Sequence, residues 1–306
     1  MKNVLKKCDL CPRNCQINRY NSKGFCNGND KIKIARASLH FYEEPSISGS
    51  NGSGTIFFSG CNLKCVYCQN KEISRNNFGT YITITRLSEI MLELQEKGAH
   101  NINLVTPTHY IPKIIKAIKK AKENGLTIPI VYNTSGYEKI ESLKLLNGYI
   151  DIYLPDFKYF NNEYGKKYSN VSNYYEKVCD AICEMFHQTG PNQFDENNLM
   201  KKGIIVRHLM LPGLKEDSKK ILNYLYSTYK DDIYISIMNQ YTPTKDIEFK
   251  ELQQPIKESD YNEVIDYAIN LGITNAYCQM DGTVSESFIP EFNLEGVKKF
   301  KEKQKI

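Results

Sequence analysis

The sequence predicts an α/β protein built around a parallel sheet, and three observations lead to this fold class. Short apolar segments rich in β-branched residues alternate with longer amphipathic segments along most of the chain. The 306 residues are 41% hydrophobic and 25% charged, which is typical of a folded globular chain. At about 150 residues per domain this length suggests two domains, but an α/β barrel of this size is often a single one.

The expected strands are apolar and are bounded by Gly, Pro or polar residues. They cover residues 54–60, 101–107, 129–135, 151–157, 203–211, 232–238 and 275–280. The expected helices repeat apolar residues three and four positions apart, and one of them ends at an Asn-Gly pair, which is a C-cap signal. They cover residues 86–97, 110–124, 137–147, 174–189, 217–230, 260–271 and 291–303.

Repeated strand–helix units indicate parallel strands joined by right-handed crossovers. Six or seven such units suit an incomplete (β/α) barrel, although a doubly wound open sheet has the same pattern. In both folds ligands bind at the carboxyl ends of the strands. The expected organisation is a Cys-rich segment with a Gly-rich cover over residues 1–53, a partial barrel over 54–290 and a basic C-terminal helix over 291–306.

Charge and hydropathy favour a cytosolic protein. No apolar run approaches the ~20 residues of a membrane helix, and the first residues lack the apolar stretch of a secretory signal. The net charge of +5 is uneven, because residues 1–36 carry nine Lys or Arg against two Asp and residues 298–306 carry five Lys against one Glu. Basic ends can attract nucleic acid or an acidic protein, or they can simply be solvated surface.

Ten cysteines in a cytosolic chain indicate metal or redox chemistry rather than structural disulfides. Cys61, Cys65 and Cys68 form the sequence CNLKCVYC. Three thiolates in one loop can hold three irons of a [4Fe–4S] cluster and leave the fourth iron open to a substrate. A zinc site with a distant fourth ligand is the alternative, but zinc sites favour paired Cys-x2–4-Cys units.

The Cys-x3-Cys-x-aromatic-Cys motif, with Tyr67 as the aromatic residue, resembles the signature of the radical S-adenosylmethionine (SAM) superfamily. The resemblance implies a partial (β/α)6 barrel in which SAM binds the open iron of a [4Fe–4S] cluster. One-electron cleavage of SAM then gives methionine and a 5′-deoxyadenosyl radical that takes a hydrogen atom from the substrate. Flanking stretches resemble the pyruvate formate-lyase activating enzyme-like branch, often labelled PflX: CDLCPRNC, EEPSISGSNGSGTIFFSGCNLKCVYCQN, NINLVTPTHY, PIVYNTSGY, DIYLPDFKY and VRHLMLPG.

Polar residues at the strand ends are the candidate SAM-binding groups, because the carboxylate, amine, ribose and adenine of SAM each need polar partners. Ordinary turns and solvated strand-end ion pairs are the alternative interpretation. Many radical SAM enzymes have a Gly-Gly-Glu stretch after the second strand, where this chain has Thr-Pro-Thr-His; His109 there is a candidate on the substrate side. The candidates are Tyr67, Thr106, Thr108, Asn133, Thr134, Ser135, Asp156, Lys158, Arg207 and Tyr241.

A second set of cysteines lies near the start of the chain. Four thiolates within 19 residues match the count for a closed site, either [4Fe–4S] or tetrahedral zinc. The three-plus-one spacing favours an iron–sulfur cluster. These residues are Cys8, Cys11, Cys15 and Cys26, whereas Cys179, Cys183 and Cys278 are interpreted as structural.

The sequence therefore predicts a cytoplasmic radical SAM enzyme of the oxidoreductase or lyase type, without identifying a catalytic residue beyond the cofactor sites. One hypothesis is an activase that removes a hydrogen atom from a glycine of a glycyl-radical enzyme. A second is an enzyme acting on a small molecule or a peptide. A third is a non-enzymatic metal-binding module that contacts RNA, although no arginine–aromatic RNA motif is present. The expected electron donor is flavodoxin or ferredoxin, and no membrane partner is expected.

Overall fold

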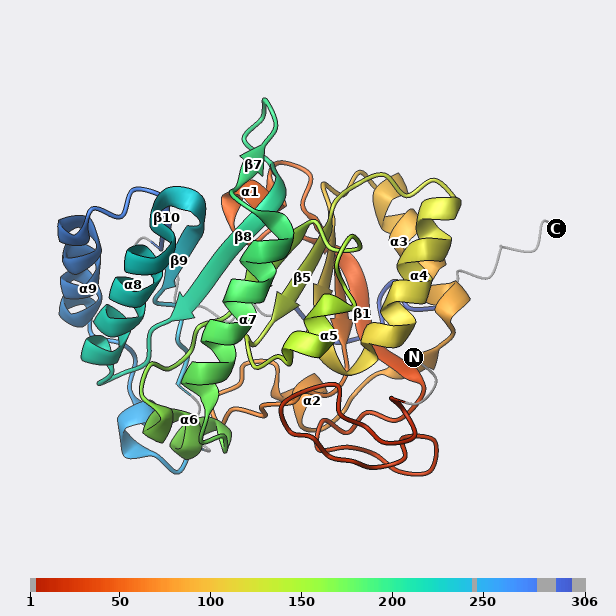
Figure 1. Cartoon of the computed structure of the whole chain (residues 1–306), viewed down its shortest axis with the longest axis horizontal. Helices are drawn as coiled ribbons and strands as arrows, with labels where there is room; N and C mark the ends of the chain where they lie inside the picture. The colour runs from red at the N-terminus through yellow and green to blue at the C-terminus, as the bar shows by residue number, and fades with distance from the viewer. Residues whose placement is uncertain (1–3, 244–246, 280–289, 299–306) are drawn as a thin grey trace.

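The computed structural model describes residues 4–243, 247–279 and 290–298. The described strands form one curved sheet with the order β10-β9-β8-β6-β5-β4-β2-β1-β3 (Figure 1). The strands are β1 (Ile32–His40), β2 (Ser53–Phe58), β3 (Thr80–Ile82), β4 (Ile102–Val105), β5 (Ile130–Thr134), β6 (Ile152–Pro155), β7 (Gln193–Phe194), β8 (Met200–Leu209), β9 (Tyr234–Met238) and β10 (Ala276–Cys278).

Neighbouring strands from β2 to β10 along this order run parallel, while β1 and β3 pair antiparallel at one edge. The short β7 lies off this path and pairs antiparallel with β8. Every residue of β2, β4, β5 and β6 is buried, as expected of parallel strands covered on both faces. Because β3 and β10 end the sheet, the described strands form a partial barrel that does not close. This confirms the expected fold class.

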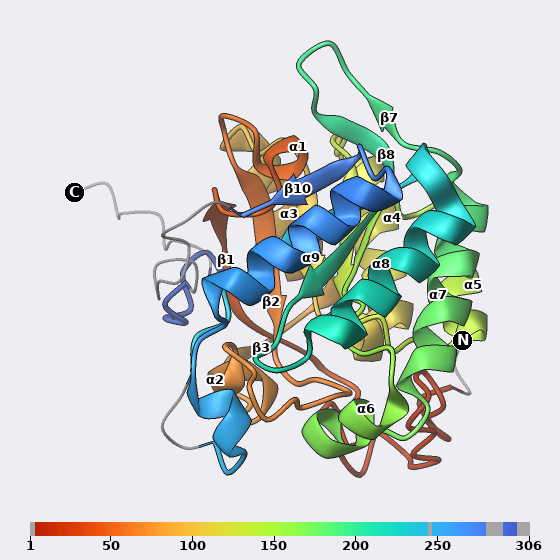
Figure 2. The same cartoon turned by 90° about the vertical axis from the view of Figure 1, so that its left-hand side faces the viewer.

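The longer helices cover the outer face of the sheet, and α8 lies beside α9 over the β8–β10 side (Figure 2). Their apolar faces pack against outward-facing strand residues in the main core, which includes Leu104, Tyr132 and Ile182. The helices are α1 (Pro45–Ser48), α2 (Lys71–Ser74), α3 (Ile84–Glu96), α4 (Ile111–Glu123), α5 (Ile140–Lys144), α6 (Asn162–Ser169), α7 (Tyr174–Thr189), α8 (Lys215–Tyr229) and α9 (Glu258–Leu271).

The segment between β1 and β2 fills the inside of the barrel. Ile47 of α1 is fully buried against the inward-facing residues Val131, Leu154 and Ile205. Pro45 at the first helical position fixes a backbone angle suited to the helix start. Of the preceding pair, Glu44 is buried as well, and Glu43 reaches Arg207 inside the barrel.

The structure differs from the sequence-based expectation in several elements. Residues 32–40 form β1, and α6 occupies a region expected to be a polar loop. The basic helix expected over 291–303 is wrong in its described part, because residues 290–298 form turns; the remainder lies outside the described residues. No helix in the described ranges is long and apolar enough to cross a membrane.

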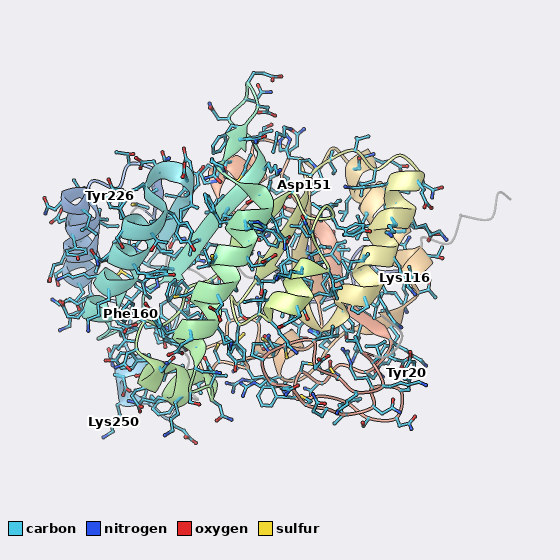
Figure 3. All side chains as sticks on the ribbon, in the orientation of Figure 1. Tyr20, Lys116, Asp151, Phe160, Tyr226 and Lys250 are labelled. Carbon is cyan, nitrogen blue, oxygen red and sulfur yellow. The ribbon has the colours of Figure 1, made fainter. Side chains whose placement is uncertain are left out.

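Residues 4–31 contain turns and extended backbone without a helix or strand. In Figure 1 these loops lie at the same end of the molecule as α2, and Figure 3 marks them by Tyr20. Because α2 directly follows the loop that contains Cys61, Cys65 and Cys68, both cysteine sets lie at this end.

Candidate active site at the carboxyl ends of the strands

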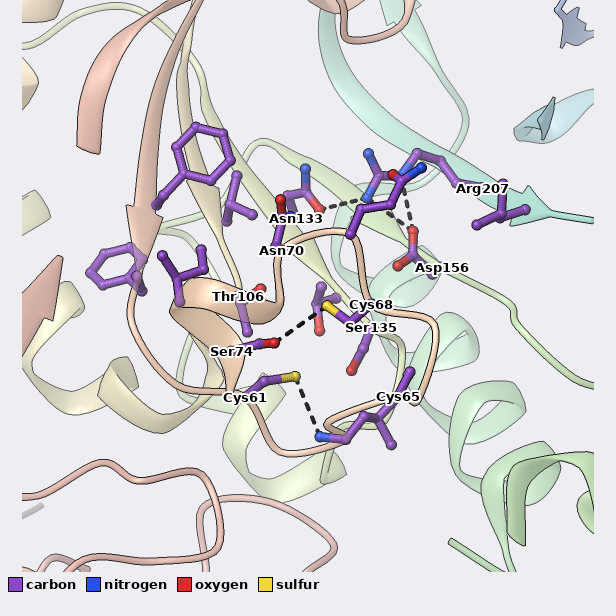
Figure 4. A pocket seen from close by; sticks show the side chains of 18 of the residues that line it. Cys61, Cys65, Cys68, Asn70, Ser74, Thr106, Asn133, Ser135, Asp156 and Arg207 are labelled. Carbon is purple, nitrogen blue, oxygen red and sulfur yellow. Dashed lines mark hydrogen bonds and ion pairs between the residues drawn. The ribbon is translucent and has the colours of Figure 1, made fainter. Parts of the chain in front are cut away.

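A cavity of about 220 Å³ lies at the carboxyl ends of the parallel strands. It is lined by the ends of β2, β4, β5, β6, β8 and β9 and by the loop that follows β2 (Figure 4). Residues from both sides of the sheet reach it, from His40 on β1 to Met238 on β9. This is the edge where parallel α/β proteins bind their ligands, as the sequence analysis expected.

The loop after β2 brings three thiols to this cavity. Positive φ angles of 94° at Gly60 and 58° at Lys64 turn the chain around Cys61. Each sulfur accepts a hydrogen bond: Cys61 from the Leu63 backbone N–H at 3.4 Å, Cys65 from the Ser169 hydroxyl at 2.9 Å, and Cys68 from the Ser74 hydroxyl at 3.3 Å. Figure 4 shows the first and the third of these contacts.

The three thiols fit the ligand set of a [4Fe–4S] cluster with one open iron. All three line the cavity, and no fourth cysteine stands among its described lining residues. Within the described ranges, no group of three or more His, Cys, Asp or Glu side chains is close enough to hold a single metal ion. Burial and the neighbouring thiols raise the pKa of Cys61 to about 12, so the Cys61 thiol remains protonated until a metal displaces its proton.

A charged network occupies the cavity beside the cysteines. The Arg207 guanidinium donates from Nε to Asp156 at 3.0 Å, from Nη1 to Glu43 at 3.1 Å and from Nη2 to Asn133 at 2.7 Å. Lys158 Nζ donates to the other oxygen of Asp156 at 2.8 Å. Lys158 and Arg207 therefore share the Asp156 carboxylate, and Arg207 forms a second ion pair with Glu43.

Burial and pairing set the protonation states of this network. Burial opposes ionisation of Asp156, but Lys158 and Arg207 outweigh it and hold the pKa of Asp156 below its ordinary value. Burial also opposes charge on Lys158, yet Asp156 and Cys65 keep the pKa of Lys158 above its ordinary value. For Glu43, burial is the larger effect and raises its pKa despite the attraction of Arg207.

Lys158 is more available to a ligand than Arg207. The guanidinium of Arg207 already contacts Asp156, Glu43 and Asn133. The ammonium of Lys158 has three N–H donors, and Asp156 is its one recorded acceptor in the described part of the chain. An incoming carboxylate can therefore pair with Lys158 without breaking an existing contact.

Most of the sequence-predicted SAM residues meet in the cavity. The ten candidates split into a group that lines it and two that do not. Those that line it are Tyr67, Thr106, Asn133, Thr134, Ser135, Asp156, Lys158 and Arg207.

The other two candidates lie behind the lining. The Thr108 hydroxyl donates to the buried Glu138 at 2.5 Å, and the Tyr241 hydroxyl donates to the Leu252 carbonyl. Tyr241 still packs edge-on against the ring of Tyr67, with centroids 6.3 Å apart.

The cavity is also lined by residues that the sequence did not single out, among them Glu43 and His40. Glu43 stands beside another glutamate before a proline, a charged pair that by itself predicts an exposed turn. Its position in the cavity depends on its contacts with Arg207 and Asn103. His40 ends β1 and lines the cavity; burial, together with the charges of Arg36 and Arg207, lowers its pKa to about 4. By contrast, His109 is buried and contacts the Ser59 carbonyl at 2.8 Å, so it does not face the substrate side as expected.

The comparisons with known proteins agree with this geometry. Residues 55–225 match the family model for the radical SAM superfamily. The chain is 33% identical over 268 residues to an uncharacterized protein of Methanocaldococcus jannaschii, covering 83% of this chain and 70% of that protein. It is 20% identical over 203 residues to pyruvate formate-lyase-activating enzyme of Staphylococcus aureus, covering 60% of this chain and 72% of that enzyme.

Among solved structures, the fold is similar to that of Streptococcus suis SuiB bound to S-adenosylmethionine. The TM-score is 0.50 at 14% identity, over 72% of this chain, and the chain spans about half of SuiB, 48% of its length. The fold and the cysteine loop define a partial-barrel protein with an iron–sulfur site at the strand ends. The chain belongs to the radical SAM superfamily, whose cofactors are a [4Fe–4S] cluster and SAM.

Proposed function

We propose that this protein is a radical SAM activase, which removes a hydrogen atom from a glycine of a glycyl-radical enzyme of the pyruvate formate-lyase type. The observation that carries the proposal is the cavity in which Cys61, Cys65 and Cys68 lie beside the Lys158–Asp156 pair. When bound, the cluster and SAM supply a one-electron cleavage of a C–S bond, which gives methionine and 5′-deoxyadenosine with a hydrogen atom taken from the substrate.

The residues of this chain have distinct roles in the proposal. The three cysteines hold the cluster, and Ser74 and Ser169 donate hydrogen bonds to two of its thiolates. Such bonds orient metal ligands and shift the reduction potential of a cluster.

The strand-end polar groups hold SAM. Lys158 binds the SAM carboxylate as a point charge, while Asp156 and Arg207 keep Lys158 in place through the network described above. The ribose hydroxyls are held by the polar side chains that end β5, namely Asn133, Thr134 and Ser135.

The choice of a protein substrate rests on the sequence relative and on the shape of the site. The relative with an assigned activity in Staphylococcus aureus is a pyruvate formate-lyase-activating enzyme. The cavity extends across the concave face of the sheet from Tyr42, which is 58% exposed, to Gln240. A cavity open at the side of the barrel can admit an extended peptide loop of a partner protein.

The proposal also places the protein in the cytosol with an acidic one-electron carrier. All ten cysteines are described and none forms a disulfide, which fits a reducing compartment. Lys6, Lys7 and Lys23 are exposed on the N-terminal loops at the end of the molecule that carries α2 (Figure 1). Flavodoxin or ferredoxin would dock there by charge attraction.

Electron paramagnetic resonance (EPR) of the partner enzyme tests this function. The reconstituted protein is incubated without oxygen with dithionite, SAM and pyruvate formate-lyase. A glycyl-radical doublet that requires SAM, and that is absent with the Cys65→Ala variant, supports the activase. SAM cleavage without any glycyl radical would refute the activase role and leave the superfamily chemistry intact.

A further inference from the structure

The four N-terminal cysteines surround one small cavity. Cys8, Cys11 and Cys26 are buried, and all four thiols line a cavity of about 10 Å³. A Cβ added at Gly24 would lie 3.6 Å from the sulfur of Cys26 and 3.7 Å from that of Cys15. Both sulfurs therefore lie close to the backbone of Gly24. The four cysteines, which lie within 19 residues of the sequence, thus line the same cavity.

The spacing of these thiols suits a cluster better than a single ion. Four sulfurs around zinc lie about 2.3 Å from the metal, which closes the space between them completely. Here, no three of these thiols in the described ranges lie close enough together to hold one metal ion. The four cysteine sulfurs that ligate a cubane lie on different irons. They are therefore farther from one another than four sulfurs around one zinc ion.

A buried cation beside the cavity indicates that an anionic group belongs there. Arg19 is 1% exposed, and its Nε has no hydrogen-bond partner. Its other contacts are the carbonyl groups of His109 and Asn29, and no carboxylate within the described ranges is recorded as its ion-pair partner. An isolated buried charge is costly. Arg19 interacts electrostatically with Cys26, so a cluster ligated by four thiolates would supply the missing negative charge.

A second polar group on the cavity is also unsatisfied. The ring of His109 lines the same cavity as the four thiols, and its Nδ1 is buried without a partner. Its Nε2 contacts the Ser59 carbonyl and must carry the proton there, which leaves Nδ1 with a free lone pair.

The N-terminal cysteine set is packed directly against the active-site loop. A Cβ at Gly60, the neighbour of Cys61, would lie 2.1 Å from the carbonyl oxygen of Cys26. Arg13, which lies between Cys11 and Cys15 in the sequence, donates to the Asn62 carbonyl at 2.8 Å and is close enough to interact electrostatically with Cys11 and Cys61. The two cysteine sets therefore share one interface with a cation between them.

We infer that Cys8, Cys11, Cys15 and Cys26 hold a second [4Fe–4S] cluster, packed against the loop of the first. Arg13 and Arg19 balance the charge of its thiolates. Neither substrate nor SAM is needed for this cluster to form, so the inference stands or falls separately from the proposed function.

Metal analysis and EPR of the full chain, reconstituted without oxygen using iron and sulfide, test the inference. The wild type should bind about eight irons and no zinc, because each cubane holds four. A Cys61→Ala, Cys65→Ala, Cys68→Ala variant should keep about four irons, and the Cys11→Ser, Cys26→Ser variant should keep the other four with the EPR signal of the first cluster. The exposed Cys183 on α7 provides the control, since Cys183→Ser should still bind about eight.

Three results would overturn the inference. About one zinc with four irons in the wild type would assign a structural zinc site instead. About four irons without zinc would leave the N-terminal thiols free. A triple alanine variant that is folded by circular dichroism but binds no iron would likewise show that the N-terminal thiols hold no cluster. The triple variant leaves the N-terminal segment unaltered, so it decides the question even if the double serine variant fails to fold.

Discussion

Arg207 and Glu43 form an ion pair inside the barrel, with 3.1 Å between Nη1 of the arginine and a carboxylate oxygen of the glutamate. The partners are 164 positions apart, one on β8 and the other just before α1. The same guanidinium also contacts Asp156. Arg207 thus pairs with two carboxylates, and its removal would leave Glu43 without this counter-charge and Asp156 paired with Lys158 alone.

Arg207→Gln should therefore lower the free energy of unfolding by about 3–5 kcal/mol. Glu43→Gln should cost less, because Asp156 still neutralises Arg207. In the double variant the losses should overlap, with a coupling energy of roughly 1–3 kcal/mol measured by urea unfolding of the metal-free protein. Strictly additive losses would show that the two charges do not interact across the barrel.

Lys158→Ala should weaken SAM binding by about ten- to hundredfold, equivalent to ~1.5–3 kcal/mol for a charge-assisted contact. Iron content should stay the same, because Lys158 contacts Asp156 rather than a sulfur. Equilibrium dialysis with labelled SAM measures the effect, and Lys144→Ala on the exposed face of α5 is the matched control. Equal affinity in both variants would mean that another group holds the SAM carboxylate.

Glu138 should make stability depend on pH. Burial raises the pKa of Glu138 from 4.5 to about 7. The hydrogen bonds from Thr108 and Thr134 lower this pKa, but burial is the larger effect. A folded pKa above the unfolded value means that the stabilisation is complete below about pH 4.5 and is lost as the pH rises through about 7.

The isosteric Glu138→Gln variant cannot ionise. The unfolding free energy of the wild type should consequently fall relative to this variant by roughly 3 kcal/mol between about pH 4.5 and pH 8. Denaturant unfolding at several pH values measures the difference, with Glu141→Gln on the surface of α5 as a control that shows no such trend. A constant difference across this range would place Glu138 in contact with water or a cation.

Ser169→Ala should lower the reduction potential of the active-site cluster. The Ser169 hydroxyl donates to the Cys65 sulfur at 2.9 Å, and a hydrogen bond to a ligating sulfur stabilises the more negative, reduced cluster. Loss of about 1 kcal/mol for a one-electron couple corresponds to a shift on the order of tens of millivolts.

Potentiometric titration followed by EPR measures this shift. Ser88→Ala, a buried serine on α3, is the control and should leave the potential unchanged. An unchanged potential in Ser169→Ala would show that this hydroxyl turns away when the cluster is bound.

Local patterns in the sequence predicted the barrel and singled out the three cysteines that line its cavity. The parallel strands are short apolar runs, and Cys61, Cys65 and Cys68 lie within a single loop, so both features are visible over a few residues. β1 was missed because Lys33 and Arg36 interrupt its apolar residues, and its place depends on pairing with β2 and β3.

Contacts between distant segments leave no local pattern in the sequence. Nothing local distinguishes Glu43 from an exposed glutamate, since its partner Arg207 lies on β8, 164 positions further along the chain. In the same way His109 is buried by the N-terminal loops, whose docking position depends on contacts such as that of Arg19 with the His109 carbonyl. Spacing identified both cysteine sets but not the interface between them.

Formation of 5′-deoxyadenosine from SAM tests the central claim most directly. The full chain is reconstituted without oxygen, reduced with dithionite and given SAM, and the products are separated by chromatography. We predict 5′-deoxyadenosine and methionine in equal amounts from the wild type, and neither from Cys65→Ala although this variant remains folded. Equal product from both proteins, or none from a wild type that binds its full complement of iron, would contradict the account.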